Sequence, residues 1–192
     1  MTPSRLFGAG GGSIGAPMNT RFLPFLIVSA LAALPVAAVA KKPAAAAHAT
    51  PAAPKKIGDF GDWVAATHQE GGQTVCYAFT RAQTSAPALS GRGPVILTVT
   101  ERASGRDAVA IEAGLTYAAN AAVTVQADRT ALEFYTARRN AFARDGKAAV
   151  VAFDNAPRAV ARSPAPKEVA DTFSLKGFSE AYKAIVKACP AK

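Results

Sequence analysis

The feature that most constrains the fold is a succession of short segments in which every second residue is apolar. An alternation of this kind places successive side chains on opposite faces of a β-strand. The segments are Gln73–Thr80, Pro94–Glu101, Asp107–Ala113, Ala121–Ala127 and the stretch around Leu132 and Phe134. Turn residues such as Gly71-Gly72 separate them, and no helical pattern lies between them. The sequence therefore predicts a mainly β protein, an antiparallel β-sandwich-like domain.

The end of the chain has a different periodicity. Apolar residues recur there at the i, i+3, i+4, i+7 and i+11 spacing of one helical face: Phe178, Ala181, Tyr182, Ile185 and Cys189. This predicts one C-terminal α-helix that closes the β-domain, with Ser174 as its cap. Arg158–Arg162 is predicted to be a further strand. Lys147–Phe153 fits either a buried strand or a short helix.

The N-terminal region has the three parts of a secretory signal. Arg21 precedes Phe22–Ala40, a 19-residue run without charge that ends in Ala38-Val39-Ala40. A basic residue, an apolar stretch and small residues at a cleavage site indicate export, with cleavage near Ala40. The alternative is an uncleaved anchor, since about 20 apolar residues can span a bilayer. Met18 is an alternative start of the chain. The expected location is the periplasm, the cell envelope or the extracellular space.

Charge supports a division of the chain into three parts. Residues 1–40 are assigned to the leader, 41–56 to an Ala/Pro/Lys-rich tether that we expect to be disordered, and 57–192 to the β-rich domain. Of the 22 basic residues, six lie in residues 1–56, which contain no acidic residue. The domain carries 16 basic and 13 acidic side chains, and it is therefore only mildly basic. No nucleic-acid partner is expected, and membrane contact is expected only through an uncleaved leader.

The chain has only two cysteines, Cys76 and Cys189, and both lie in the predicted exported domain. A pair of cysteines in an oxidising compartment usually forms a disulfide, and two residues allow only one connectivity. The bond would join the strand at Cys76 to the end of the C-terminal helix. The alternative is a redox-active pair, but catalytic dithiols are normally close in sequence, as in C-x-x-C.

Residues capable of catalysis or metal binding are sparse in the domain. His68 is its only histidine, and we place it in a solvated turn after the first strand. One histidine and two oxidised cysteines cannot supply the three or four ligands of a zinc site. Asp59 and Asp62 lack the spacing of a calcium loop. Gly10–Gly15 matches the dinucleotide-binding pattern, but no strand precedes it. The sequence predicts no catalytic residue, no metal and no cofactor.

Two short motifs point to a family. The chain contains Phe60-Gly61-Asp62-Trp63 near the start of the domain and Ser174-Leu175-Lys176-Gly177-Phe178 before the closing helix, with Cys76-Tyr77 and Ala188-Cys189 in the same order. In these residues it resembles the invasion-associated locus B family. The resemblance implies a small, β-sandwich-like exported protein of Alphaproteobacteria, in a family named for one pathogen's entry into host cells. It carries over no catalytic residue, and the motif residues are expected to be structural.

The chain departs from the family at one point. The family usually has a cysteine shortly after the tryptophan, whereas Val64–His68 contains none. The expected function is that of a non-enzymatic envelope protein that acts by binding or by supporting the surface, with a role in host-cell contact if the organism is a pathogen. The expected partner is an envelope or host-surface protein or polymer. The alternative is a periplasmic enzyme inhibitor or a small hydrolase.

Overall fold

The computed structural model describes residues 53–164 and 168–191. The predicted leader and residues 41–52 of the predicted tether lie outside these ranges. The first strand, β1 (Lys55–Phe60), begins two residues before the predicted start of the domain. Lys55 and Lys56 pair with Thr67 and Ala66 of the next strand. These pairs form through main-chain groups while both lysines stay exposed, so the strand has no apolar pattern to reveal it.

Eleven strands of the described residues form one antiparallel sheet, which confirms the mainly β fold. After β1, the strands are β2 (Trp63–Glu70), β3 (Gln73–Arg81), β4 (Thr84–Ala86), β5 (Ile96–Arg102), β6 (Gly105–Glu112), β7 (Ala122–Ala127), β8 (Thr130–Ala137), β9 (Asn140–Ala143), β10 (Arg158–Pro164) and β11 (Glu168–Ser174). The alternating segments correspond to β3, β5, β6, β7 and β8. The short strands β4 and β9 have too few residues to give a period-two signal.

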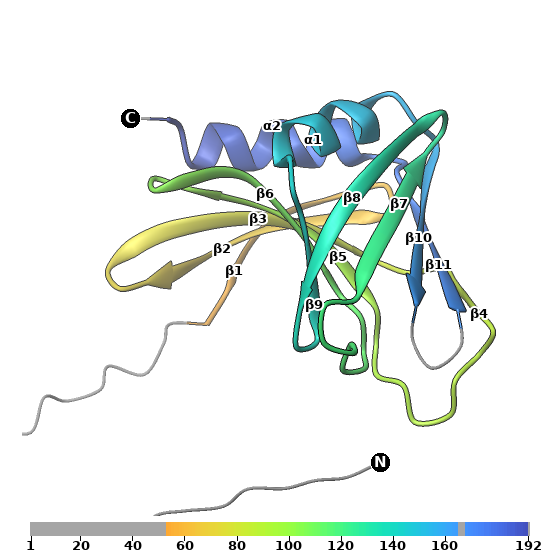
Figure 1. Cartoon of the computed structure of the whole chain (residues 1–192). Helices are drawn as coiled ribbons and strands as arrows, with labels where there is room; N and C mark the ends of the chain where they lie inside the picture. The colour runs from red at the N-terminus through yellow and green to blue at the C-terminus, as the bar shows by residue number, and fades with distance from the viewer. Residues whose placement is uncertain (1–52, 165–167, 192) are drawn as a thin grey trace, which may run out of the picture. The chain divides into compact units, whose positions relative to one another are not determined.

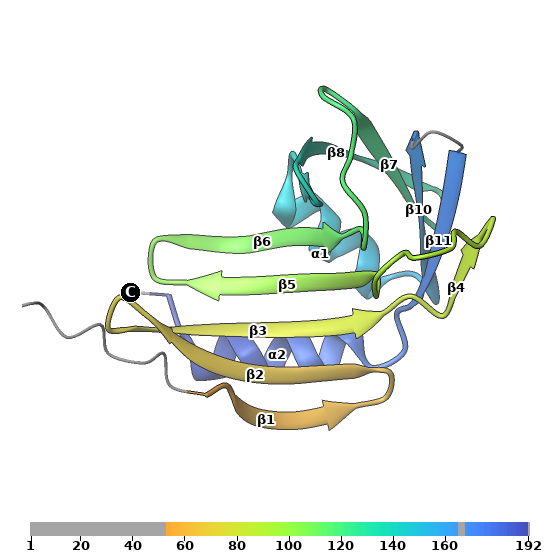
Figure 2. The same ribbon diagram turned by 90° about the horizontal axis from the view of Figure 1, so that it is seen from below.

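The sheet curves into a sandwich-like body. Its strand order is β1-β2-β3-β5-β6-β9-β8-β7-β10-β11-β4. Only Ala82 and Gln83 separate β3 from β4, although β4 lies at the far end of this order. Ala82 N donates to Val95 O at 2.9 Å, and Gln83 N donates to Thr172 O at 2.8 Å. The chain thus leaves one layer, made of β1, β2, β3, β5 and β6, and joins the other (Figure 2).

Two helices cover one face of the first layer (Figure 1). The ambiguous segment Lys147–Phe153 is helical and lies in α1 (Gly146–Asp154), where Ala148 N donates to the side chain of Asp145 at 2.9 Å. The predicted C-terminal helix is α2 (Phe178–Ala188). Neither helix in the described ranges has the length and hydrophobicity needed to cross a bilayer.

The predicted cap of α2 is wrong. Ser174 is the last residue of β11, and Gly177 occupies the cap position with a φ of 87°. A left-handed φ is accessible to glycine without steric cost, which allows the chain to turn sharply from strand to helix. The Oγ of Ser174 instead accepts a hydrogen bond from Lys176 N at 3.2 Å within this turn.

Candidate functional site

The two motifs, 111 residues apart, meet at one point of the fold. Trp63 is fully buried, and its Nε1 donates to Ser174 O at 3.0 Å. Asp62 N donates to Lys176 O at 3.0 Å. The ring of Trp63 also meets Phe178 edge to face, with 5.0 Å between the ring centroids. These contacts hold the start of β2 against the turn that leads into α2.

The glycines of both motifs are required by close main-chain contacts. Gly61 has a φ of 55°, and a Cβ there would lie 2.7 Å from Lys176 O. A Cβ on Gly177 would lie 2.0 Å from Phe60 O. Beside them Leu175 is buried, and its N donates to Pro157 O at 3.0 Å. In the structure the motif residues therefore form a packing joint and leave no space there for a ligand.

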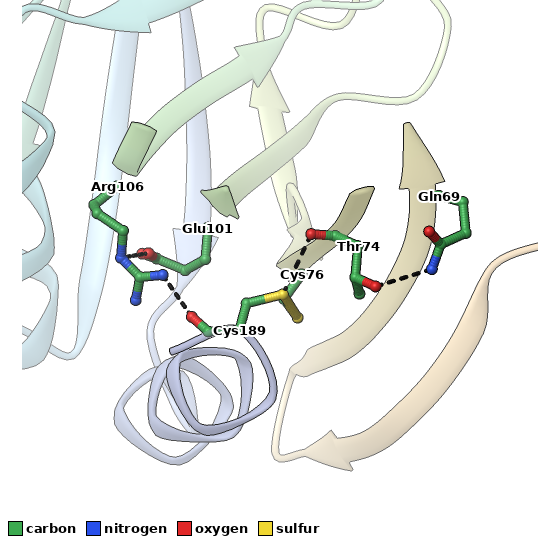
Figure 3. Close-up of a disulfide and its surroundings, with 6 residues drawn as sticks. All are labelled: Gln69, Thr74, Cys76, Glu101, Arg106 and Cys189. Carbon is green, nitrogen blue, oxygen red and sulfur yellow. Dashed lines mark hydrogen bonds and ion pairs between the residues drawn. A yellow bond between two sulfur atoms is a disulfide. The ribbon is translucent and has the colours of Figure 1, made fainter. Parts of the chain in front are cut away.

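Cys76 and Cys189 form a disulfide, with 5.9 Å between their Cα atoms (Figure 3). The bond links the middle of β3 to the residue after α2, across 113 residues of chain. Closing so long a loop removes many conformations from the unfolded chain. Together with the joint at the start of α2, the disulfide fixes both ends of this helix to the sheet.

A buried carboxylate lies beside the disulfide. Glu101 of β5 has no exposed surface, and its Oε1 accepts a hydrogen bond from Asp107 N at 3.1 Å. Its Oε2 forms an ion pair with Arg106 Nε at 2.5 Å, without the geometry of a hydrogen bond. Arg106 Nη1 also donates to Cys189 O at 2.5 Å (Figure 3). Burial raises the pKa of Glu101 to about 7.

Tyr182 of α2 completes this cluster. Its hydroxyl donates to Asp107 Oδ1 at 2.5 Å. Burial is the main cause of the raised pKa of Tyr182, and the contact with Asp107 raises this pKa further. Both oxygens of Glu101 face groups of the β5–β6 hairpin itself. The contacts of Arg106 with Cys189 O and of Tyr182 with Asp107 then join this hairpin to α2 and its end. The cluster therefore fixes α2 to the β5–β6 hairpin.

The position predicted for His68 is wrong. It lies inside β2, paired with Val75, because this strand continues to Glu70 before the turn at Gly71. Its Nε2 lies 2.8 Å from Glu70 Oε1, and its ring packs edge to face on Tyr77 at 5.3 Å. Among residues 53–164 and 168–191, no three His, Cys, Asp or Glu side chains are grouped to hold a metal.

The face of the sheet opposite α2 carries a groove. One row of paired residues crosses four strands, from Phe79 of β3 through Thr98 and Ala110 to Phe142 of β9. Small residues thus form the floor, on β5 and β6, while aromatic residues form the walls. The hollow has a volume of about 520 Å³. Figure 2 looks onto the β3, β5 and β6 part of this face, with α2 behind the strands.

A second row extends the groove along the strands. Tyr77 pairs with Thr100, which pairs with Ala108, so the floor is again small beside an aromatic wall. We call this surface the aromatic groove; its residues are Tyr77, Phe79, Thr98, Thr100, Ala108, Ala110 and Phe142. The rings of Tyr77 and Phe79 are stacked with centroids 6.0 Å apart. Phe142 is stacked on Tyr135 of β8 at 5.5 Å. Because β3 and β9 are three ladder spacings apart, the walls stand about 14 Å apart at the backbone.

Charged residues lie at the ends of the aromatic groove. At one end Arg102 binds Glu70 through two hydrogen bonds of 2.9 and 3.0 Å. The pKa of Glu70 is lowered to about 2, mainly by the hydrogen bond with Arg102 and next by the one with His68. This carboxylate therefore stays charged at neutral pH. At the other end Glu112 lies 3.9 Å from Arg139. The floor between these ends is uncharged.

Sequence reasoning named no binding face. The alternation of Tyr77 and Phe79 in β3 was visible, but it did not distinguish the core face from the open one. Cys76 and Ala78 proved to be buried under α2, while the two aromatic residues are only half-buried. Phe142 completes the groove through the pairing of β9 with β6, and no local pattern encodes that pairing.

Comparisons with known proteins identify relatives of this fold. A family model described as "Invasion associated locus B (IalB) protein" matches residues 63–186. The crystal structure of invasion associated protein b from Bartonella henselae is similar, with a TM-score of 0.51 and 18% sequence identity. The match covers 68% of this chain and 95% of that chain. At this identity the likeness concerns the fold. A search of curated proteins finds no match.

Proposed function

The chain belongs to the invasion associated locus B family, and from this premise we propose that it is an exported cell-envelope protein that acts by binding and not by catalysis. Export is supported by the sequence of Phe22–Ala40, with Arg21 before it and Ala38-Val39-Ala40 at its end. The disulfide between Cys76 and Cys189 also suits an oxidising compartment outside the cytoplasm.

The observation that carries the binding proposal is the aromatic groove. Solvent-accessible stacked rings on both walls of a hollow of about 520 Å³ offer apolar surface to a ligand. Pockets of several hundred Å³ that combine apolar walls with a few polar groups are the usual form of a ligand site. The buried carboxylates lie outside the groove: Glu101 lies on the opposite face and Asp171 lies on β11, and both are paired with arginine. This separation favours a binding role over a hydrolytic one.

The ligand is expected on the cell envelope or, where the organism is a pathogen, on the host surface. The name "invasion associated" is that of the Bartonella henselae protein whose crystal structure is similar. For this chain a role in host contact is a proposal that rests on family membership. The groove supports the narrower statement that the partner is an extended molecule, because the floor runs along two neighbouring strands, β5 and β6.

Export can be tested with the full chain carrying a C-terminal tag. We expect the protein to be recovered from the periplasmic or envelope fraction of a bacterium, with an N-terminus at Lys41 and no free thiol. The N-terminal sequence and a thiol-labelling assay with and without reductant measure both features. Recovery in the cytosol with an intact leader and two free thiols would contradict the proposal.

Binding can be tested by co-sedimentation of the exported protein with purified cell envelopes. Ala110→Arg places a long side chain on the groove floor without removing any core residue. Thr124→Arg is the matched control, because Thr124 lies on the exposed face of β7 outside the groove. We expect Ala110→Arg to reduce the bound fraction and Thr124→Arg to leave it unchanged. Equal retention of all three proteins would mean that the groove has no part in envelope attachment.

A further inference from the structure

We propose that the aromatic groove binds an extended, uncharged glycan chain whose sugar rings pack against its walls. The inference rests on the proposed binding function and adds the chemical class of the ligand. It follows from three features of the groove: the two stacked aromatic pairs, the small hydroxyl-bearing floor, and the pairing of the charges at its ends.

The walls suit flat rings with an apolar face. Tyr77 with Phe79, and Phe142 with Tyr135, form two stacked pairs that are partly open to solvent. Tyr135 is the most accessible of the four, at 46% exposed. A pyranose ring has an apolar face of C–H groups and a polar rim, and it can lie against such a wall while its hydroxyls remain in water. Aromatic rings provide large apolar contact areas of this kind.

The floor favours a glycan over a peptide. Its strands lie within the sheet, and their main-chain groups are already paired, so an extended peptide cannot be added there as another strand. Thr98 and Thr100 of β5 bring hydroxyl-bearing side chains to the floor beside Ala110 and Ala108 of β6. A peptide would need partners for every main-chain group that it buries. A sugar chain needs few hydrogen-bond partners from the protein, since each hydroxyl that does not bind a threonine can still face water.

The charges favour an uncharged ligand. Glu70 and Arg102 neutralise each other at one end of the groove, and Glu112 faces Arg139 at the other. Arg81, at the Glu112 end, is the one further charged residue that lines this hollow among the described residues. An anionic polymer would have to compete with Glu112 and would find no row of free cations along the floor. The groove is therefore complementary to a neutral chain.

The test is isothermal titration of the exported, disulfide-bonded protein with neutral hexasaccharides: chitohexaose, cellohexaose and maltohexaose. We expect at least one of them to bind. Phe142→Ala removes a wall, and Ala110→Arg fills the floor. Each should weaken binding at least tenfold, while Thr124→Arg should bind like the wild type. Circular dichroism and melting curves establish that each variant is folded, and Ala110→Arg tests the groove without loss of packed aromatic surface.

Two further probes separate the alternatives. Heparin represents an anionic glycan, and a peptide with the sequence of residues 43–54 represents an extended chain rich in alanine and proline. Groove-dependent binding of heparin or of the peptide, without binding of any neutral hexasaccharide, would overturn the glycan assignment. If all probes fail but Ala110→Arg still reduces envelope co-sedimentation, the ligand class is wrong and the binding function stands. If neither assay responds to Ala110→Arg, both proposals fail.

Discussion

Replacing Glu101 by glutamine should change the pH dependence of stability in a way that its burial dictates. Glu101 has no exposed surface, and burial raises its pKa from 4.5 to about 7. A carboxyl whose pKa is higher in the folded state than in the unfolded state binds its proton more tightly when folded. Its stabilising contribution is thus complete below about pH 4.5 and is lost as the pH rises to about 7.

The size of the effect follows from the two pKa values. Each unit of difference between the folded and unfolded pKa corresponds to about 1.4 kcal/mol. The free energy of unfolding of the wild type should therefore fall, through Glu101, by about 3 kcal/mol between pH 4.5 and pH 8. Glutamine has a similar shape and no charge at either pH. The free energy of unfolding of Glu101→Gln, measured relative to the wild type at the same pH, should therefore rise by about 3 kcal/mol over this range.

Urea denaturation of the disulfide-bonded proteins at pH 4.5 and pH 8 measures this difference. Other titrating groups, including Glu70, are common to both proteins and cancel in the comparison. Glu133→Gln is the matched control, because the Glu133 side chain is 82% exposed on β8, and its difference from the wild type should not change with pH. If Glu101→Gln is equally or more destabilising at pH 8 than at pH 4.5, the ion pair with Arg106 compensates fully for burial. The argument from desolvation would then be refuted.

Two further predictions concern the elements that hold α2. Cys76→Ser should lower the free energy of unfolding by about 4–5 kcal/mol in oxidising buffer; thermal melts should converge with the wild type under reductant, and equal melting without reductant would contradict a stabilising disulfide. Gly177→Ala should lower the free energy of unfolding by more than about 3 kcal/mol. The new Cβ would lie 2.0 Å from a main-chain carbonyl oxygen, and the alanine would also have to adopt a left-handed φ. Gly72→Ala has a similar φ of 81° and open space around it, so in chemical denaturation its cost should be only about 1 kcal/mol.

The sequence was informative where a side chain's environment follows from its immediate neighbours. The five alternating segments became strands, and the stripe from Phe178 to Ile185 became α2, with Cys189 directly after its end, because each has one buried and one more exposed face. Lys147–Phe153 is almost uniformly apolar, so its periodicity could not separate helix from strand. His68 was misplaced because the turn begins three residues later, at Gly71.

The alternation of β5 itself indicates the buried carboxylate. In β5 the alternation that buries Leu97 and Val99 continues to Glu101, which places a carboxylate on the core face. A charged residue in register with an apolar face indicates either the end of the buried stretch or a paired buried group. The partner Arg106 lies five residues later, across the turn between β5 and β6. The hairpin itself therefore supplies the compensating charge.

The two faces of the first layer separate the contacts that hold the fold from the proposed binding surface. One face carries the joint of Trp63 and Gly177, the disulfide and the Glu101 cluster, and each of these fixes α2 to the sheet. The motifs that identify the family lie at this joint and therefore report the fold. The aromatic groove lies on the opposite face, at positions such as Thr98 and Ala110 that contribute little to the core. Substitutions in its lining should therefore leave the fold intact, and the proposed ligand is inferred from this groove and not from the family motifs.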